Sequence, residues 1–300
     1  MSRALLSILL LGAALPFPSS AASPAGGFDI FASDDGDDTS VLRTNLTAYY
    51  RYDHPGQYRG LTVERARIRP LGTDGWSENR VYFRFADAAG DWKWNGQIGS
   101  NGHTLLGNAS IVRDIPRRQE YFIEREVVET RQGEQGLHAT FAGAAIDLPL
   151  DAQQRQQMTL LAGMQTFTGD NVRAHLRATY SAQLVQEWGL GAQLRTRAFH
   201  SSHPGEADYY SPRWFAEAIP MLRLRRFHHG WMMAAGAGVG MQRDSNSDAR
   251  AARLVEAIIE SPKSPRHWYL RASGTYSNTP VGEGINYGYR QISVQLIKPF

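Results

Sequence analysis

Cysteine is absent from all 300 residues of the sequence. Its absence excludes a disulfide framework, and it also excludes a lipid anchor attached to a cysteine behind an N-terminal leader. A protein of the cell envelope without disulfides needs another source of stability, and a closed β-sheet supplies one. The absence of cysteine is therefore compatible with an all-β envelope protein.

Long hydrophobic runs are also missing. Beyond residue 22, no segment has 18 uninterrupted apolar residues, and the mean hydropathy is −0.41. These values exclude a helical membrane protein. They do not exclude a transmembrane β-barrel, because its lipid-facing apolar residues alternate with polar residues that face the lumen. The formal net charge of +3 and the pI of about 9.1 reflect the arginines, and we expect no nucleic-acid partner.

The N-terminal residues have the pattern of a targeting signal. A short basic start is followed by an almost wholly apolar run over residues 4–17 and by the small residues Ser20-Ala21-Ala22. We interpret residues 1–22 as a secretory signal peptide and exclude them from the fold. An uncleaved anchor is the alternative, but the apolar run is shorter than the roughly 20 residues of a membrane-spanning helix.

Residues 23–41 follow the signal peptide and are rich in aspartate. We expect them to form an acidic periplasmic leader in front of the folded domain. A calcium-binding loop is the alternative interpretation, but the order of the aspartates does not match an EF-hand and the closing glutamate is missing.

From about residue 42 onward, apolar residues recur with a period of two. In Val172–Leu184, every second residue, starting with Val172, is apolar or aromatic. The residues between them are polar, and the first three are Arg173, His175 and Arg177. Helices place apolar residues at i+3 and i+4, so this segment is predicted to be a strand. Its length exceeds the five or six residues usual in soluble sheets and suits a tilted transmembrane strand of about 9–11 residues with an overhang.

Similar runs, separated by turn residues, continue to the C-terminus. The pattern predicts an all-β fold, an antiparallel transmembrane β-barrel of the outer membrane that spans residues 42–300 with 14–16 strands. The range reflects about 15 recognisable segments and the even strand number of bacterial barrels. The segment Thr104–Val112 alternates least clearly. A soluble sandwich of two sheets is the alternative, but two sheets would leave much of the apolar surface of such long strands uncovered.

The last ten residues form an amphipathic strand that closes on an aromatic residue. Ile292, Val294, Leu296 and Phe300 share one face. This arrangement resembles the C-terminal signal of bacterial outer-membrane barrels. It implies a place in the bacterial outer membrane, contact with outer-membrane lipid, and recognition of the Phe300 strand by the barrel assembly machinery.

The orientation follows from this terminal strand, which must descend to the periplasm. Segments 199–212, 242–249 and 277–286 are then expected to be extracellular loops, and segments 227–230 and 261–266 periplasmic turns.

Arginine is frequent on the polar face of the predicted strands. We expect the following residues to line the lumen: Arg65, Arg67, Arg80, Arg84, Arg173, Arg177, Arg195, Arg197, Arg223, Tyr82 and Tyr269. Two interpretations remain open. In the first, the arginines form ion pairs with lumen carboxylates and fill a narrow barrel. In the second, they form a basic pore that attracts anions or sugar polymers, with the tyrosine rings stacking on sugar rings.

Catalytic and metal-binding patterns are weak. The segment His200-Ser201-Ser202-His203 lies in a predicted extracellular loop and could supply the Ser–His pair of a lipid hydrolase. His228-His229 has no identifiable third ligand for a metal. We therefore predict no catalytic residue, no metal and no cofactor.

The region from Thr168 to Phe300 resembles the barrel of outer-membrane exopolysaccharide export porins. These include the poly-N-acetylglucosamine exporter and the outer-membrane subunit of cellulose synthase. The resemblance rests on four features of the sequence: Thr168-Gly169-Asp170-Asn171-Val172-Arg173, Tyr209-Tyr210-Ser211-Pro212 before a strand with Phe215, Ala218 and Leu222, the glycine-rich strand with Gly236, Gly238 and Gly240, and the terminal Phe300.

The resemblance implies an outer-membrane pore for export of, or association with, an exopolysaccharide. Members of that family carry periplasmic tetratricopeptide repeats, and no 34-residue helical period occurs in this sequence. A separate periplasmic repeat protein is therefore an expected partner, together with the polysaccharide. Two alternatives stay open, an enzyme that modifies lipid A or phospholipid and a structural or adhesion barrel with a closed lumen.

Overall fold

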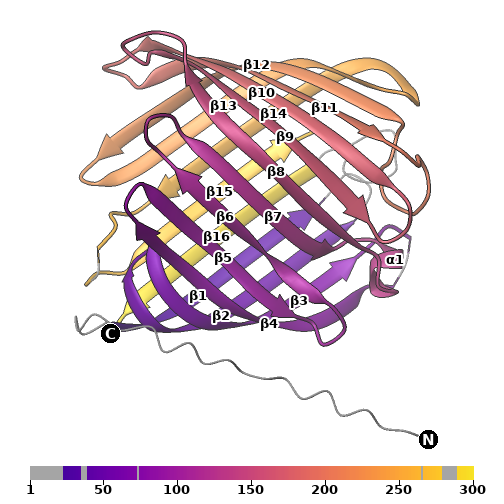
Figure 1. The fold of residues 1–300 in the computed structure, drawn as a ribbon, viewed down its shortest axis with the longest axis horizontal. Coiled ribbons are helices and arrows are strands. Elements are labelled where there is room, and N and C mark those ends of the chain that lie inside the picture. Colours follow the sequence, from indigo (N-terminus) through magenta and orange to yellow (C-terminus); the bar gives the residue numbers. More distant parts are fainter. Residues whose placement is uncertain (1–22, 35–38, 73, 265, 279–288) are drawn as a thin grey trace, which may run out of the picture.

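The computed structural model describes residues 23–34, 39–72, 74–264, 266–278 and 289–300 (Figure 1). The predicted signal peptide, residues 1–22, and most of the loop expected at 277–286 lie outside these ranges.

The described residues form one closed antiparallel barrel of 16 strands, as the sequence predicted. Each strand hydrogen-bonds to its neighbours in chain order, and β1 pairs with β16 to close the sheet. The strands are β1 (Ser23–Asp34), β2 (Ser40–His54), β3 (Gln57–Arg69), β4 (Trp76–Ala89), β5 (Trp92–Ser100), β6 (Leu105–Arg113), β7 (Gln119–Val127), β8 (His138–Pro149), β9 (Gln156–Phe167), β10 (Val172–Val185), β11 (Leu190–Ser201), β12 (Trp214–His228), β13 (Trp231–Asp244), β14 (Ser247–Glu260), β15 (Tyr269–Ser277) and β16 (Tyr289–Pro299).

The poorly alternating segment near residue 104 is β6, a full member of the wall. In the described part of the chain, helix is confined to the single turn α1 (Arg131–Glu134), which is capped by the Thr130 hydroxyl. No helix among the described residues has the length and apolar character needed to cross a bilayer.

The prediction of an acidic leader over residues 23–41 was wrong. Residues Ser23–Asp34 are β1, which pairs with β16 on one side and β2 on the other, and β2 begins at Ser40. The aspartates misled the interpretation, because a lumen-facing strand position accepts a carboxylate that has a partner. Asp29 occupies such a position and accepts a hydrogen bond from Arg84.

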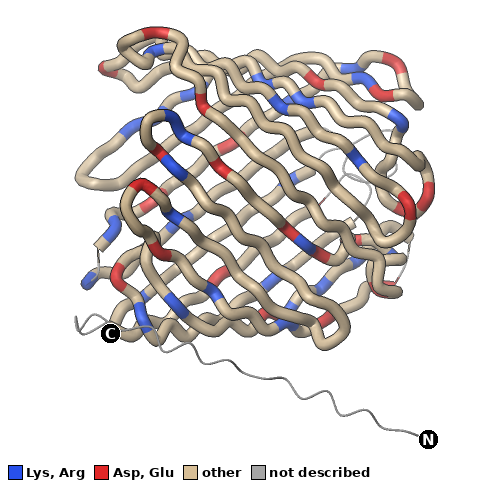
Figure 2. Tube along the Cα trace, viewed as in Figure 1, with Lys and Arg blue, Asp and Glu red and all other residues tan. Residues whose placement is uncertain are grey.

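The alternation of side chains gives the wall an apolar outer face and a mixed inner face. On β10, Leu176 is 64% exposed on the outer face, whereas Arg173 and His175 beside it are buried on the inner face. Apolar side chains on the outer face of a closed sheet suit a bilayer as the surrounding solvent. Charged positions along the strands are separated by long uncharged stretches (Figure 2).

The two ends of the barrel differ. β1 begins and β16 ends at the same end, since Ala25 pairs with Pro299. Turns at this end include those at residues 55–56, 90–91 and 229–230. The opposite end carries the loop with α1 and the long loop at residues 202–213 (Figure 1). Because bacterial barrels keep short turns at the periplasm, the end with β16's last residue is periplasmic by this rule. The loops at 202–213 and 245–246 then lie at the extracellular end, as expected.

The glycine-rich strand β13 illustrates why the wall needs glycine. A Cβ at Gly240 would lie 1.9 Å from the backbone oxygen of Ala218, whereas the nearest atom to a Cβ at Gly274 is 3.7 Å away. We therefore expect Gly240→Ala to lower the free energy of unfolding by about 1–3 kcal/mol, the usual cost of overpacking. Gly274→Ala is the matched control and should leave it within about 0.5 kcal/mol. Urea titration of the barrel refolded into lipid vesicles measures both. Equal stability of the two variants would contradict the close approach.

Candidate functional site: the interior of the barrel

The barrel encloses a cavity of about 890 Å³. Its lining residues come from strands around the barrel and include Asp29 on β1, Arg173 on β10 and Gln295 on β16. The rings of Tyr209 and Tyr210 reach it from the 202–213 loop, so the cavity lies towards the extracellular end. Its charged lining residues are the carboxylates Asp29, Glu64, Glu124, Glu126 and Glu129 and the arginines Arg43, Arg84, Arg173 and Arg271. The lining is therefore of mixed charge and is not a basic ring.

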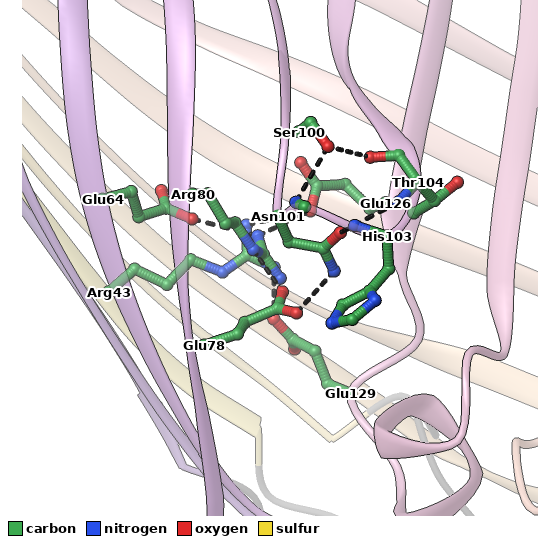
Figure 3. A network of polar contacts seen from close by, with 11 residues as sticks. Arg43, Glu64, Glu78, Arg80, Ser100, Asn101, His103, Thr104, Glu126 and Glu129 are labelled. Carbon is green, nitrogen blue, oxygen red and sulfur yellow. Dashed lines mark hydrogen bonds and ion pairs between the residues drawn. The ribbon is translucent and has the colours of Figure 1, made fainter. Parts of the chain in front are cut away.

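One wall of the cavity is a buried ion network centred on Arg80, which is fully buried (Figure 3). Its Nη1 donates to Glu64 Oε1 at 3.0 Å and to Glu126 Oε2 at 3.0 Å, and its Nε donates to Glu78. These groups come from β3, β4 and β7, so the network joins strands that are not neighbours. Arg80 faces inward as predicted, but carboxylates neutralise its charge.

A second arginine extends this network. Arg43 on β2 donates from Nη2 to Glu129 Oε1 at 2.5 Å, and its Nη1 lies 3.6 Å from Glu126 Oε2. Asn101 closes the other side by donating to Glu78 Oε2 at 2.6 Å. Two arginines thus face four carboxylates, which leaves this part of the interior with an excess of negative charge.

Arg84 also faces the cavity and is held by an acid from the first strand. Its Nη1 donates to Asp29 Oδ2 at 2.6 Å and to Thr47 Oγ1 at 3.4 Å. Arg84 was predicted from the sequence. Asp29 was not, because it lay in the segment assigned to the leader.

The opposite wall, β10 to β12, carries the remaining predicted arginines on its inner face. The register pairs Arg177 with Arg197 and Arg195 with Ile219. Two of these arginines are neutralised: Arg195 makes a two-bond contact with Glu256 at 2.9 and 2.7 Å, and Arg197 lies 3.6 Å from Glu217.

Arg177 and Arg223 have no such partner. Among the described residues, neither has a carboxylate within ion-pair distance, although Arg177 lies over the Phe141 ring. These two arginines therefore carry inner-face charge that no described ion pair neutralises.

Arg173 has a structural role. Its guanidinium lies over the rings of Phe199, Phe167 and Tyr209, with distances to the centroids of 4.5, 5.1 and 5.7 Å. Its Nη2 donates to the backbone oxygen of Tyr210 at 2.6 Å. Cation–π contacts of a desolvated guanidinium are strong enough to fix a loop. Arg173 thus holds the 202–213 loop to the wall, and only part of it lines the cavity.

Other contacts fix the same loop. The Tyr210 hydroxyl donates to Asp244 Oδ2 at 2.6 Å, and Asp208 accepts hydrogen bonds from the Thr130 hydroxyl at 2.7 Å and the Gln132 amide at 2.8 Å. Tyr209 stacks on Phe167 at a centroid distance of 4.0 Å, and burial raises the pKa of its phenol. The loop is therefore tied to β13, to α1 and to the β9–β10 hairpin. Its sequence Tyr209-Tyr210-Ser211-Pro212 had been noted for resemblance and not as part of a site.

Two predicted lumen residues, Arg65 and Arg67, lie on the wrong face. They share the outer face of β3 with Leu61 and Val63, which are 57% and 58% exposed, and the residues between them point inward and are buried. A period of two separates the faces of a strand but does not say which is inner. Both faces of β3 carry charge, so the arginines did not indicate which face points into the lumen.

Tyr82 and Tyr269 do point inward, but they cannot stack on a sugar. Each is at most 2% exposed. Tyr82 packs with Leu106 and Val127, and Tyr269 packs in a cluster with Tyr49, Tyr52 and Ile297. They fill the space behind the cavity.

The candidate hydrolase pair does not have catalytic geometry. The Ser202 oxygen lies 3.1 Å from His203 Nδ1, but the hydroxyl accepts a hydrogen bond from the Val172 amide at 2.8 Å, and the same ring nitrogen lies 3.1 Å from the Asp170 backbone oxygen. These contacts close the turns at the ends of β10 and β11. In the residues that the structure describes, no group of three His, Cys, Asp or Glu side chains is placed to hold a metal.

Comparison with solved structures agrees with the fold. A structure described as a bacterial polysaccharide outer membrane secretin has a TM-score of 0.67 at 12% identity, with 94% of this chain and 99% of that chain covered. The outer-membrane protein OmpT of Vibrio cholerae (9% identity, 95% and 99% covered) and a BenF-like porin from Pseudomonas fluorescens (7% identity, 93% and 99% covered) both have a TM-score of 0.46. No protein-family model and no curated protein sequence matches. The chain has the fold of an outer-membrane barrel, which points to the bacterial outer membrane.

The buried network makes a prediction about stability. Arg80→Leu leaves Glu64, Glu78 and Glu126 without their shared cation, so the free energy of unfolding should fall by about 3–5 kcal/mol. Combining Arg80→Leu with Glu→Gln at the three partners should restore most of the lost stability, because amides need no counter-charge. The outward-facing Arg253→Leu is the control and should not destabilise. Urea unfolding in vesicles measures the stability of all three variants. An unchanged free energy of unfolding in Arg80→Leu would show that the network does not stabilise the barrel.

Proposed function

We propose that this protein is an outer-membrane pore for a polar saccharide chain, in export or in association. The observation that carries the proposal is the mixed-charge cavity of about 890 Å³ inside the barrel. The similarity in fold to a structure described as a polysaccharide outer membrane secretin supports it.

The chemistry of the cavity suits such a chain. Sugar hydroxyls both donate and accept hydrogen bonds, and the lining offers carboxylate acceptors such as Glu124 and guanidinium donors such as Arg271. A ring of one sign would hold a polyion tightly, whereas mixed charge allows many weak contacts, which conduction requires. Neutral or weakly charged saccharides are therefore preferred over strongly anionic ones.

The test is conductance across a planar bilayer. Refolded protein should give stable channels, and neutral or partly deacetylated N-acetylglucosamine oligomers should block the current at lower concentration than uronic-acid oligomers of equal length. A folded barrel without conductance would favour the closed-lumen alternative. Release of fatty acid from labelled lipid A or phospholipid by such a silent barrel would favour the enzyme.

The two unpaired arginines make a sharper prediction. Replacing Arg177 and Arg223 together by glutamine removes two inner-face charges that have no described carboxylate within ion-pair distance, so the anion-to-cation permeability ratio should fall below that of the wild type. Arg226→Gln is the matched control, because Arg226 is on the same strand as Arg223 but faces outward with Met233. Reversal potentials in a salt gradient measure the ratio. An unchanged ratio in the double variant would remove both residues from the ion path.

A further inference from the structure

The outer face of β3 carries three arginines in succession, at Arg65, Arg67 and Arg69. All three are exposed. The inner-face residues between them, Ala66 and Ile68, are buried, so the arginine side chains project away from the lumen. Arginine on the lipid face is costly at the centre of a bilayer and tolerated near its surface, so the position of these residues along the strand matters.

Nothing among the described residues neutralises this patch. Arg65 donates only to uncharged groups, at 3.4 Å to Asn79 Oδ1 and at 3.3 Å to Ser77 Oγ on the neighbouring strand. None of the three arginines is within ion-pair distance of a described carboxylate. Two outward arginines at the other end of β2 and β3 do have carboxylate partners: Arg51 lies 3.0 Å from Asp53, and Arg59 lies 3.2 Å from Asp87.

The patch lies at the extracellular end of the wall. Arg69 is the last residue of β3 and pairs with Ser40, the first residue of β2, at the end opposite to the C-terminus. On the neighbouring β4, Ser77 and Asn79 lie closer to the extracellular end than the last residue of β5. That residue, Ser100, pairs with Val81. The β3–β4 hairpin therefore rises above its neighbour β5 and presents hydroxyl, amide and guanidinium donors at the surface of the outer leaflet.

We propose that Arg65, Arg67 and Arg69, with Ser77 and Asn79, bind the phosphate groups of a phosphorylated lipid in the outer leaflet of the membrane. Guanidinium forks match phosphate oxygens in two-bond geometry, and the bonds are charge-assisted. The acyl chains of such a lipid lie along the apolar outer face below, where Val63, Leu61 and Phe83 are exposed. The lipid phosphates supply negative charge where the described residues place no carboxylate within ion-pair distance of the three arginines.

The test compares bisphosphorylated lipid A with its dephosphorylated form as ligands for the refolded barrel in detergent micelles, by native mass spectrometry and by thermal unfolding. The phosphorylated form should bind the wild type at least about tenfold more tightly, since one charge-assisted hydrogen bond is worth about that factor. R65Q/R67Q/R69Q should lose this preference. The control R51Q/R59Q removes outward arginines at the periplasmic end and should keep it.

Four outcomes would overturn the assignment. Equal affinity of wild-type protein for the two lipid A forms would show that phosphate is not recognised. A preference kept by R65Q/R67Q/R69Q would place the phosphate site elsewhere. A dimer of the wild type that dissociates in R65Q/R67Q/R69Q, with no lipid bound, would make the patch an interface between two copies of the chain. Inorganic phosphate, added alone, should not protect against unfolding, and protection by it would show an ion site without a lipid.

Discussion

Closure of the sheet between β1 and β16 is the constraint on which the rest of the structure depends. In a bilayer, each unpaired backbone N–H or C=O costs several kcal/mol, so a sheet can span it only without an edge. The register from Ala25–Pro299 to Asp34–Arg290 removes both edges at once. The need for this pairing explains why residues 23–34 form a strand despite their aspartates. It also fixes the termini of the barrel at one end, and with them the direction of every loop.

Closure also determines how charge is tolerated inside. A buried guanidinium is acceptable where carboxylates, hydrogen bonds or aromatic rings replace its water, as around Arg80 and Arg173. The acids come mostly from β1 to β7 and the unpaired arginines from β10 to β12, so the two halves of the wall carry charge of different sign. The cavity lining itself contains both carboxylates and arginines, so it forms no ring of one charge.

The sequence predicted much of the fold and less of the site, and the reasons are physical. Strand number, antiparallel order and outer-membrane type follow from a period of two over long segments, which β10 shows most clearly. The face was predicted correctly for Arg177 because Leu176 and Ala178 are apolar, and wrongly for Arg65 because both faces of β3 carry apolar as well as charged residues. The partners of Arg80 differ in this respect: Glu78 is two residues away on the same face, whereas Glu126 is 46 residues away and is brought in by curvature of the sheet. Tyr82 and Tyr269 had the right direction, but no local pattern reports whether a ring in a lumen is covered.

At the extracellular end, the 202–213 loop is fixed to the wall of the barrel by contacts with three strands. The 202–213 loop is joined to β9 by the Tyr209–Phe167 stack, to β10 by Arg173 and to β13 by Tyr210. Each contact uses a residue whose position is set by the register of a different strand. The loop cannot move as a unit without breaking aromatic, cation–π and charge-assisted contacts together. The two tyrosines at the cavity are therefore fixed parts of its wall, and their positions depend on the register of the strands that hold them.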